Sequence, residues 1–126
     1  MIDEIYKRGN KIFFCPCSVT INTLHGKWKT SILWLIRNKV NRFGQFSRAI
    51  PEINKGVLTR VLRELERDGL LSRKIFAEIP PRVEYEMTAL GKSIIPVLDK
   101  LAAWGKANSK RSKGRPTIET LQEIRH

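Results

Sequence analysis

The sequence predicts a mainly helical α+β fold that carries one small β-hairpin. Apolar residues recur at helical spacing from residue 19 to residue 65. They then alternate at every second position between residues 71 and 87, and helical spacing returns from residue 88 to residue 105. The chain has 126 residues, 41% of them hydrophobic and 29% charged, which fits one globular domain of about 100–150 residues. We expect residues 1–105 to form this domain.

The net charge is strongly positive for so short a chain. Lys and Arg number 24 against 12 acidic residues, which gives a formal charge of +12. Residues 27–63 contain nine basic residues and one acidic residue, and residues 100–126 contain seven and two. A basic excess concentrated in this way predicts a polyanionic partner, and nucleic acid is the commonest one.

Several features predict a cytoplasmic protein without a membrane span. The longest uncharged stretch, Ile12 to Gly26, is interrupted by polar residues and by Pro16, so it does not form a continuous apolar span. The acidic N-terminus does not resemble a secretory signal. Cys15 and Cys17 are separated by one residue, too close to join distant segments, so we expect reduced thiols.

Three short helical segments are expected before residue 54. The first covers Val19 to Leu24, the second covers Lys27 to Asn38, and the third follows Arg42 and ends before Pro51. Gly26 separates the first two. The large aromatic residues of these segments fall on apolar faces, so they are expected in the core rather than stacked on bases: Trp28, Trp34, Phe43 and Phe46.

The segment from Asn54 to Gly69 is predicted to be a helix marked at both ends. Asn54 suits an N-cap, and Gly69 suits the left-handed residue that follows a helix. One face is apolar, through Val57, Leu58, Val61, Leu62 and Leu65, and the opposite face is basic, through Lys55, Gly56, Thr59, Arg60, Arg63 and Arg67. Three helices of which the last is divided in this way predict a helix-turn-helix with its last helix in a major groove.

After Gly69 the spacing predicts a hairpin. Leu71, Ile75 and Ala77 form one arm, and Val83, Tyr85 and Met87 alternate with charged residues in the other. Residues 78–81 connect them and include two prolines, which place Arg82 near the tip. Such a hairpin suits a wing that lies along a phosphate backbone or reaches into a minor groove.

A last helix is predicted from a Thr88 cap to Gly105. Its apolar face is wider than one small domain needs, which indicates a partner subunit, while Pro96 should bend it or remove a hydrogen bond. Beyond it, residues 106–126 are expected to form a basic flexible tail, with at most a short helix between Thr117 and Arg125.

Taken together, these motifs resemble the HxlR family of bacterial transcriptional regulators, over roughly residues 15–105. The residues that carry the resemblance are Cys15-Pro16, Gly26-Lys27-Trp28-Lys29, Arg42-Phe43, Leu58-Thr59-Arg60-Val61-Leu62-Arg63-Glu64-Leu65-Glu66-Arg67-Asp68-Gly69-Leu70, Pro80-Pro81-Arg82-Val83-Glu84-Tyr85 and Ile95-Pro96-Val97-Leu98. The resemblance implies a winged helix-turn-helix that forms a homodimer through its terminal helices and binds operator DNA. His25 departs from the family pattern, since a small residue is common there.

The basic face and the resemblance together predict the residues that contact DNA and those that contact the second subunit. Double-stranded DNA is expected to bind Lys27, Lys29, Arg42, Asn54, Lys55, Gly56, Thr59, Arg60, Arg63 and Arg82. Which of these read bases stays open. The dimer contact is expected to use Phe13, Phe14, Ile94, Val97, Leu98, Leu101 and Trp104.

Cys15 has three interpretations at this stage. Some members of the family use a cysteine at the matching position to sense oxidants or electrophiles, and nearby Lys11 would favour its thiolate. An inert, partly buried thiol is the second interpretation. Metal binding with Cys17 is the third, although two thiols make an incomplete site. The effector itself cannot be named from the sequence.

The tail and the overall function also have alternatives. Residues 110–116 resemble an AT-hook, with Lys113 in place of the arginine that usually precedes the glycine, or else form a disordered tail that adds non-specific phosphate affinity. No catalytic constellation is present, so we expect neither enzymatic activity nor a cofactor or metal. The rival functions are a basic RNA-binding or structural protein and, more remotely, a thiol oxidoreductase.

Overall fold

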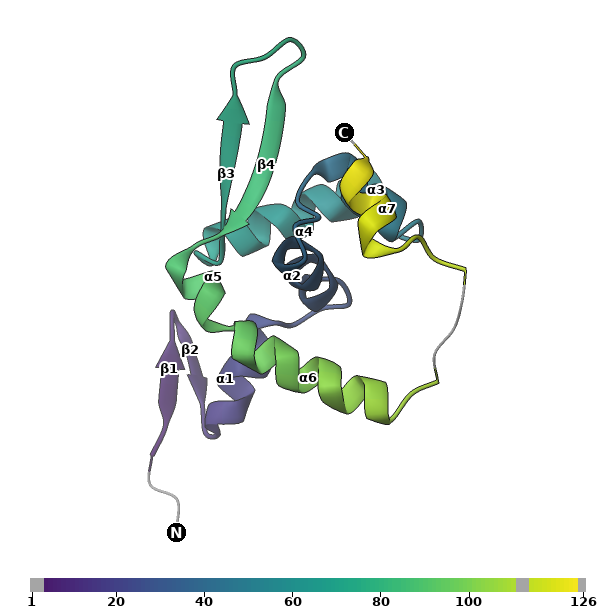
Figure 1. Cartoon of the computed structure of the whole chain (residues 1–126). Helices are drawn as coiled ribbons and strands as arrows, with labels where there is room; N and C mark the ends of the chain where they lie inside the picture. The colour runs from purple at the N-terminus through teal and green to yellow at the C-terminus, as the bar shows by residue number, and fades with distance from the viewer. Residues whose placement is uncertain (1–3, 111–113, 125–126) are drawn as a thin grey trace.

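The computed structural model describes residues 4–110 and 114–124 of the chain, which form a helical body with two hairpins (Figure 1). The elements in chain order are β1 (Tyr6–Arg8), β2 (Lys11–Phe13), α1 (Pro16–Thr23), α2 (Lys29–Arg37), α3 (Phe43–Ala49), α4 (Lys55–Arg67), β3 (Leu71–Phe76), β4 (Arg82–Met87), α5 (Ala89–Ser93), α6 (Ile95–Ala107) and α7 (Ile118–Glu123). The β3–β4 hairpin extends away from the body, and the β1–β2 hairpin lies beside α1 (Figure 1). No helix among the described residues is long and apolar enough to cross a membrane.

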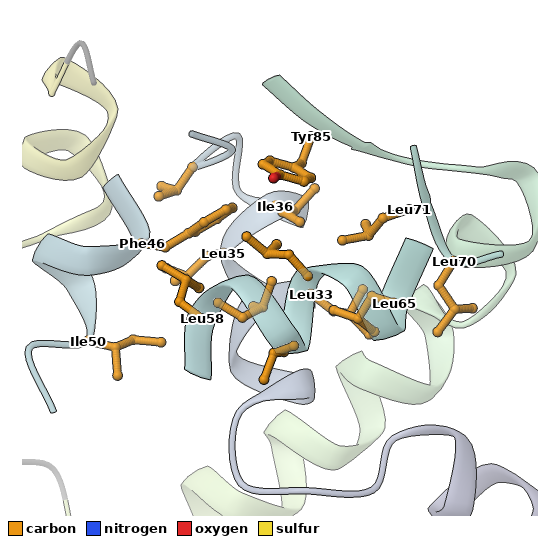
Figure 2. Close-up of a cluster of buried hydrophobic side chains, with 14 of the residues drawn as sticks. Leu33, Leu35, Ile36, Phe46, Ile50, Leu58, Leu65, Leu70, Leu71 and Tyr85 are labelled. Atoms are coloured by element: carbon orange, nitrogen blue, oxygen red, sulfur yellow. The ribbon is translucent and has the colours of Figure 1, made fainter. Parts of the chain in front are cut away.

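The core lies where α2, α3 and α4 meet the base of the β3–β4 hairpin. Its largest completely buried side chains are Phe46, Ile32, Leu33, Leu58, Leu62 and Leu65. Figure 2 shows Phe46 and Tyr85 among the side chains of this cluster, and their ring centroids are 6.1 Å apart. Each such side chain contributes about 1.5–3 kcal/mol by leaving water. The expected core position of Phe46 is confirmed, whereas Trp28 and Phe43 pack against the cluster while partly exposed.

The expected helix of residues 54–69 is confirmed as α4. The Asn54 side chain accepts a hydrogen bond from the backbone N–H of Val57 at 2.8 Å, which satisfies a donor that the first turn would otherwise leave free. At the other end Gly69 adopts φ +79°, a left-handed conformation that a side chain would strain. The sequence-predicted apolar stripe faces inward, with Leu58, Val61, Leu62 and Leu65 buried.

The β3–β4 hairpin is confirmed as an antiparallel pair in which Leu71 lies opposite Met87. Only its base belongs to the core, because the strands extend beyond the helical body (Figure 1). Ile75 lies in β3 as expected, but it is 67% exposed, whereas Leu71, Tyr85 and Met87 are buried. The base is tied to the body by a hydrogen bond from the Tyr85 N–H to the Asn41 carbonyl at 2.9 Å.

The last predicted helix is divided in two. Thr88 does cap it, since its hydroxyl accepts the Gly91 N–H at 3.0 Å. Helix α5 ends at Ser93, however, and α6 begins at Ile95 with Pro96 in its first turn. Proline has no N–H and is tolerated only where that group needs no helical partner, so it starts a new helix instead of continuing the old one.

The N-terminal region contains a hairpin that the sequence analysis did not predict. Strands β1 and β2 pair through a tight turn at Gly9-Asn10, in which Gly9 adopts φ +60°. Such a two-residue Gly-Asn turn is a known hairpin signal. The following helix, α1, begins at Pro16 rather than at residue 19, and Ile21 on it is exposed.

In the described part of the expected flexible tail, residues 106–110 and 114–124, part of the chain is helical. Helix α6 continues to Ala107, and the allowed short helix is present as α7, capped by the Thr117 hydroxyl. Leu121 of α7 is only 3% exposed and belongs to the core cluster, because α7 packs against α3. The buried amide of Gln45 donates a hydrogen bond to the Ile124 carbonyl at 2.9 Å. Lys113 of the suggested AT-hook lies outside the described residues, and Arg115 pairs with Glu52.

Candidate nucleic-acid interface

The outward face of α4 is a basic ridge, formed by Gly56, Arg60, Arg63 and Arg67. These residues follow one another at spacings of four, three and four, which places them along one side of a helix, opposite the buried stripe. All four are exposed. Gly56 at the start of the ridge has no side chain, which leaves room for a ligand to approach the backbone of α4 closely. Arg67 completes this row but is not among the predicted DNA contacts, although its helical spacing alone places it on the basic face.

Helices α3 and α4 form a helix-turn-helix that orients this ridge. The turn between them is closed by a hydrogen bond from the Ile53 N–H to the Ile50 carbonyl at 3.1 Å, and both side chains are buried. At the start of α3 the side-chain Oε1 of Gln45 accepts hydrogen bonds from the backbone N–H groups of Asn41 and Arg42 at 2.8 and 2.9 Å. The turn between the two helices is therefore held by the burial of Ile50 and Ile53 and by its backbone hydrogen bond, while Gln45 caps the start of α3.

The polar residues of α4 that are predicted to contact DNA differ in whether they already form hydrogen bonds within the helix. Lys55 is exposed at its first turn. The Thr59 hydroxyl donates to the Lys55 carbonyl at 2.8 Å, and the Asn54 side-chain oxygen is used by the cap. A hydroxyl oxygen keeps acceptor capacity while it donates. Arg63 is exposed, and none of the ion pairs found among the described residues includes it.

Glu64 pairs with two of the predicted DNA-contacting cations, Lys29 and Arg60, which differ in their exposure. The Lys29 ammonium lies 3.3 Å from a Glu64 carboxylate oxygen and 3.9 Å from Asp68, and only 12% of its side chain is exposed. Arg60 also pairs with Glu64, at 3.0 Å, but is 61% exposed. Burial acts to raise the pKa of Glu64, yet the hydrogen bonds and charges of Arg60 and Lys29 hold that pKa below its ordinary value. Lys29 therefore ties α2 to α4.

Lys27 and Arg42 come from the segments that precede α2 and α3. Lys27 is exposed, with its ammonium 4.8 Å from the centre of the Trp28 ring. Arg42 is half-buried and immediately precedes α3. Both positions adjoin helix starts, where partial positive charge favours phosphate.

The wing carries balanced charges rather than a basic edge. Arg82 stacks over the Phe76 ring at 3.9 Å and pairs with Glu84 at 3.4 Å and with Glu78 at 3.5 Å. Its Nε atom is buried and has no hydrogen-bond partner among the described residues. The structure therefore places Arg82 below the tip in a neutralised cluster. The tip instead presents Ile79, which is fully exposed.

The residues predicted for the subunit contact separate into an exposed stripe and a buried group. Val97, Leu101 and Trp104 lie at spacings of four and three on α6 and are exposed, Trp104 by 71%. Phe14 is also exposed, while Phe13 and Ile94 are half-buried. Leu98 differs from the expectation, because it is 3% exposed and belongs to the core of its own chain.

Cys15 lies between β2 and α1, at the N-cap position of that helix. It is partly exposed, and Cys17 is exposed. Hydrogen bonds from the backbone N–H groups of Cys17 and then Ser18 stabilise the thiolate and lower the pKa of Cys15. The arrangement satisfies two requirements of a reactive thiol, namely access to solvent and stabilisation of the anion.

Comparisons with known proteins agree with this geometry. The HxlR-like helix-turn-helix family model matches residues 23–113, which include the helix-turn-helix and the wing. An HTH-type transcriptional regulator of Methanothermobacter thermautotrophicus is 46% identical over 98 residues, which cover 78% of this chain and 75% of the relative. The HTH-type transcriptional regulator YkvN of Bacillus subtilis is 38% identical over 112 residues, 89% of this chain and 95% of the relative.

Solved structures agree as well. The redox regulator HypR in its oxidised form is 35% identical, with a TM-score of 0.71, over 77% of this chain and all of that chain. The reduced form of the transcriptional regulator YodB from B. subtilis is 25% identical, with a TM-score of 0.64, over 79% of this chain and 98% of that chain. This chain therefore belongs to the HxlR-like helix-turn-helix family of transcriptional regulators.

Proposed function

We propose that this regulator binds an inverted-repeat DNA operator as a homodimer, and that oxidants or electrophiles weaken the binding through Cys15. The observation that supports DNA recognition most directly is the basic ridge on α4. Three arginines and one glycine face outward on a capped helix whose opposite face is locked into the core. Arginine suits guanine edges and phosphates, and α4 has the length to cross a major groove.

The exposed stripe on α6 supports the homodimer. Val97, Leu101 and Trp104 form a stripe of exposed apolar surface on one helix of the isolated chain, and Phe14, which follows β2, is exposed as well. Contiguous apolar patches of this kind are typical of subunit contacts. Two copies joined through α6 would present two α4 ridges, which would read half-sites about one helical turn, ~34 Å, apart.

Selection from random DNA duplexes is the test of operator binding. We expect the recovered sites to be inverted repeats, and Arg63→Ala to weaken binding to them. Recovery of no palindromic duplex, or tighter binding to single-stranded RNA than to any duplex, would sink the proposal.

The oligomeric state is tested separately by light scattering at micromolar concentration. Leu101→Glu and Trp104→Glu are expected to give monomers with reduced DNA affinity, because an unpaired carboxylate in an apolar contact is costly. Ala103→Glu is the matched control, since Ala103 is exposed on the same helix but outside the stripe. Leu98→Glu is avoided because Leu98 stabilises its own chain. A monomeric wild type, or dimeric variants, would contradict the dimer.

The oxidant response is supported by the position of Cys15 and by its stabilised thiolate. Among the structural neighbours, HypR is a redox regulator and YodB has been solved after diamide treatment. We expect diamide to weaken operator binding by the wild type, because it takes two electrons and two protons from two thiols as Cys15 forms a disulfide with Cys17 or with Cys15 of the second subunit. Cys15→Ser should stay bound, while Cys17→Ser is intermediate or unaffected. Equal release by the wild type and Cys15→Ser would contradict the proposal.

A further inference from the structure

A polar cleft of about 680 Å³ lies between the N-terminal hairpin and the C-terminal half of α4. The strand ends beside the hairpin turn contribute Arg8 and Lys11, and α4 with its C-cap contributes Glu64, Arg67 and Asp68. Lys29 at the start of α2 also lines it. Figure 1 shows the tip of the β1–β2 hairpin directed toward the end of the body where α4 leads into β3.

The charges in this cleft leave an unneutralised basic group. The two carboxylates, Glu64 and Asp68, are already compensated by two cations, because the Lys29 ammonium lies 3.3 and 3.9 Å from them and Arg60 pairs with Glu64 at 3.0 Å. Within residues 4–110 and 114–124, the ion pairs found include none that involves Arg8, Lys11 or Arg67. These three cations therefore face the cleft without a carboxylate of their own.

The pairing of the hairpin adds a second, independent observation. Arg8 and Lys11 are directly opposite each other in the β1–β2 ladder. Cross-strand neighbours share a face of the sheet, and like charges in such positions repel each other. Lys7 pairs with Ile12 on the other face. A bound anion between Arg8 and Lys11 would convert this repulsion into two favourable contacts.

The cleft is located where a DNA strand would pass. The wing lies on one flank of α4, where Arg73 pairs with Glu66 at 3.2 Å. The cleft lies on the other flank, where Glu64 and Lys29 meet, and Arg67 belongs both to the cleft and to the basic ridge. A helix in a major groove has a phosphate backbone on each side.

We propose that this cleft is a phosphate-binding site for the DNA strand on the side of α4 away from the wing, with Arg8 and Lys11 as its contact residues. The inference rests on the proposed binding of duplex DNA. It extends the interface beyond the helix-turn-helix to the N-terminal hairpin. Because the wing is charge-balanced, this site supplies phosphate contacts that the wing does not.

The test is the salt dependence of duplex binding by the full-length protein. Fluorescence anisotropy with a duplex recovered by selection measures the slope of log affinity against log salt for the wild type, for Arg8→Ala/Lys11→Ala and for Lys7→Ala. Each lost phosphate contact lowers the slope by about 0.9. We expect the double variant to lose about one to two units of slope and Lys7→Ala, the matched control on the opposite face, to keep the wild-type slope.

The Tm from thermal unfolding shows whether each variant is folded, so a lower slope is not mistaken for a loss of folding. Removal of the Arg8 and Lys11 repulsion should leave the Tm of the double variant unchanged or higher. A double variant that is folded and matches Lys7→Ala in slope and affinity would overturn the inference, while binding by the wild type would leave the proposed function intact. If millimolar inorganic phosphate raises the Tm of the wild type but the double variant keeps the full slope, the cleft binds a free anion and the DNA contact is overturned.

Discussion

Replacement of Leu121 by Ala measures how firmly the C-terminal helix is attached to the core. Leu121 is 3% exposed and belongs to the same buried cluster as the side chains of α2 and α4. The substitution removes three carbon atoms, worth about 0.8 kcal/mol each in transfer free energy, and leaves a cavity that adds to the loss. Because α7 has only six residues, it can detach from the core instead of leaving a cavity. We therefore expect the free energy of unfolding to fall by about 2–3 kcal/mol.

Urea unfolding followed by circular dichroism, at a fixed protomer concentration, gives this free energy. The control is Ile79→Ala at the fully exposed wing tip, which should change the free energy by less than about 0.5 kcal/mol. A chain that ends at residue 116 lacks α7 altogether and should lose about as much stability as Leu121→Ala if the helix detaches. A loss from Leu121→Ala no larger than that of Ile79→Ala would refute the argument that α7 packs into the core.

Three further outcomes are expected. Gly91→Ala should lower the free energy of unfolding by about 1–3 kcal/mol or more, because the new Cβ would lie 2.2 Å from the Leu70 carbonyl oxygen. At Gly105 the new Cβ would meet open space, so Gly105→Ala should raise the free energy of unfolding by about 0.5–1 kcal/mol. Thermal unfolding of the two variants distinguishes the two signs. Arg63→Ala should cost about 1–3 kcal/mol of operator affinity in anisotropy titrations if Arg63 reads a base. Lys29→Ala should instead lower the free energy of unfolding by about 1 kcal/mol, because Lys29 forms an ion pair with Glu64. In a Cys17→Ser background, the lowered pKa of Cys15 should make this thiol react with an alkylating agent at lower pH in the folded protein than in urea. The stability that the folded protein gains from the Cys15 thiolate is present above the unfolded pKa and is lost as pH falls through the folded pKa. A shared midpoint in the two states would contradict the thiolate assignment.

The elements that the sequence determined are those whose signal is local. Asn54, Gly69 and the stripe between them define α4, because capping and amphipathic spacing depend only on neighbouring residues. The family resemblance also depends on order and spacing along the chain, and the family match agrees with it. The missed N-terminal hairpin had a local signal too, the Gly9-Asn10 turn, but its strands have three residues each and show little periodicity.

Other features depend on which distant residues meet, so they are established by the contacts of the folded chain. Leu98 has the same helical spacing as its exposed neighbours, yet its side chain is buried because α6 turns that face toward its own core. Arg82 and Lys29 read as free cations in the sequence, but Glu84 and Glu64 neutralise them across elements. Leu121 lies in a polar tail and is buried because α3 offers it an apolar surface. Composition and periodicity describe what a segment can bury, whereas contacts between distant elements determine what it does bury.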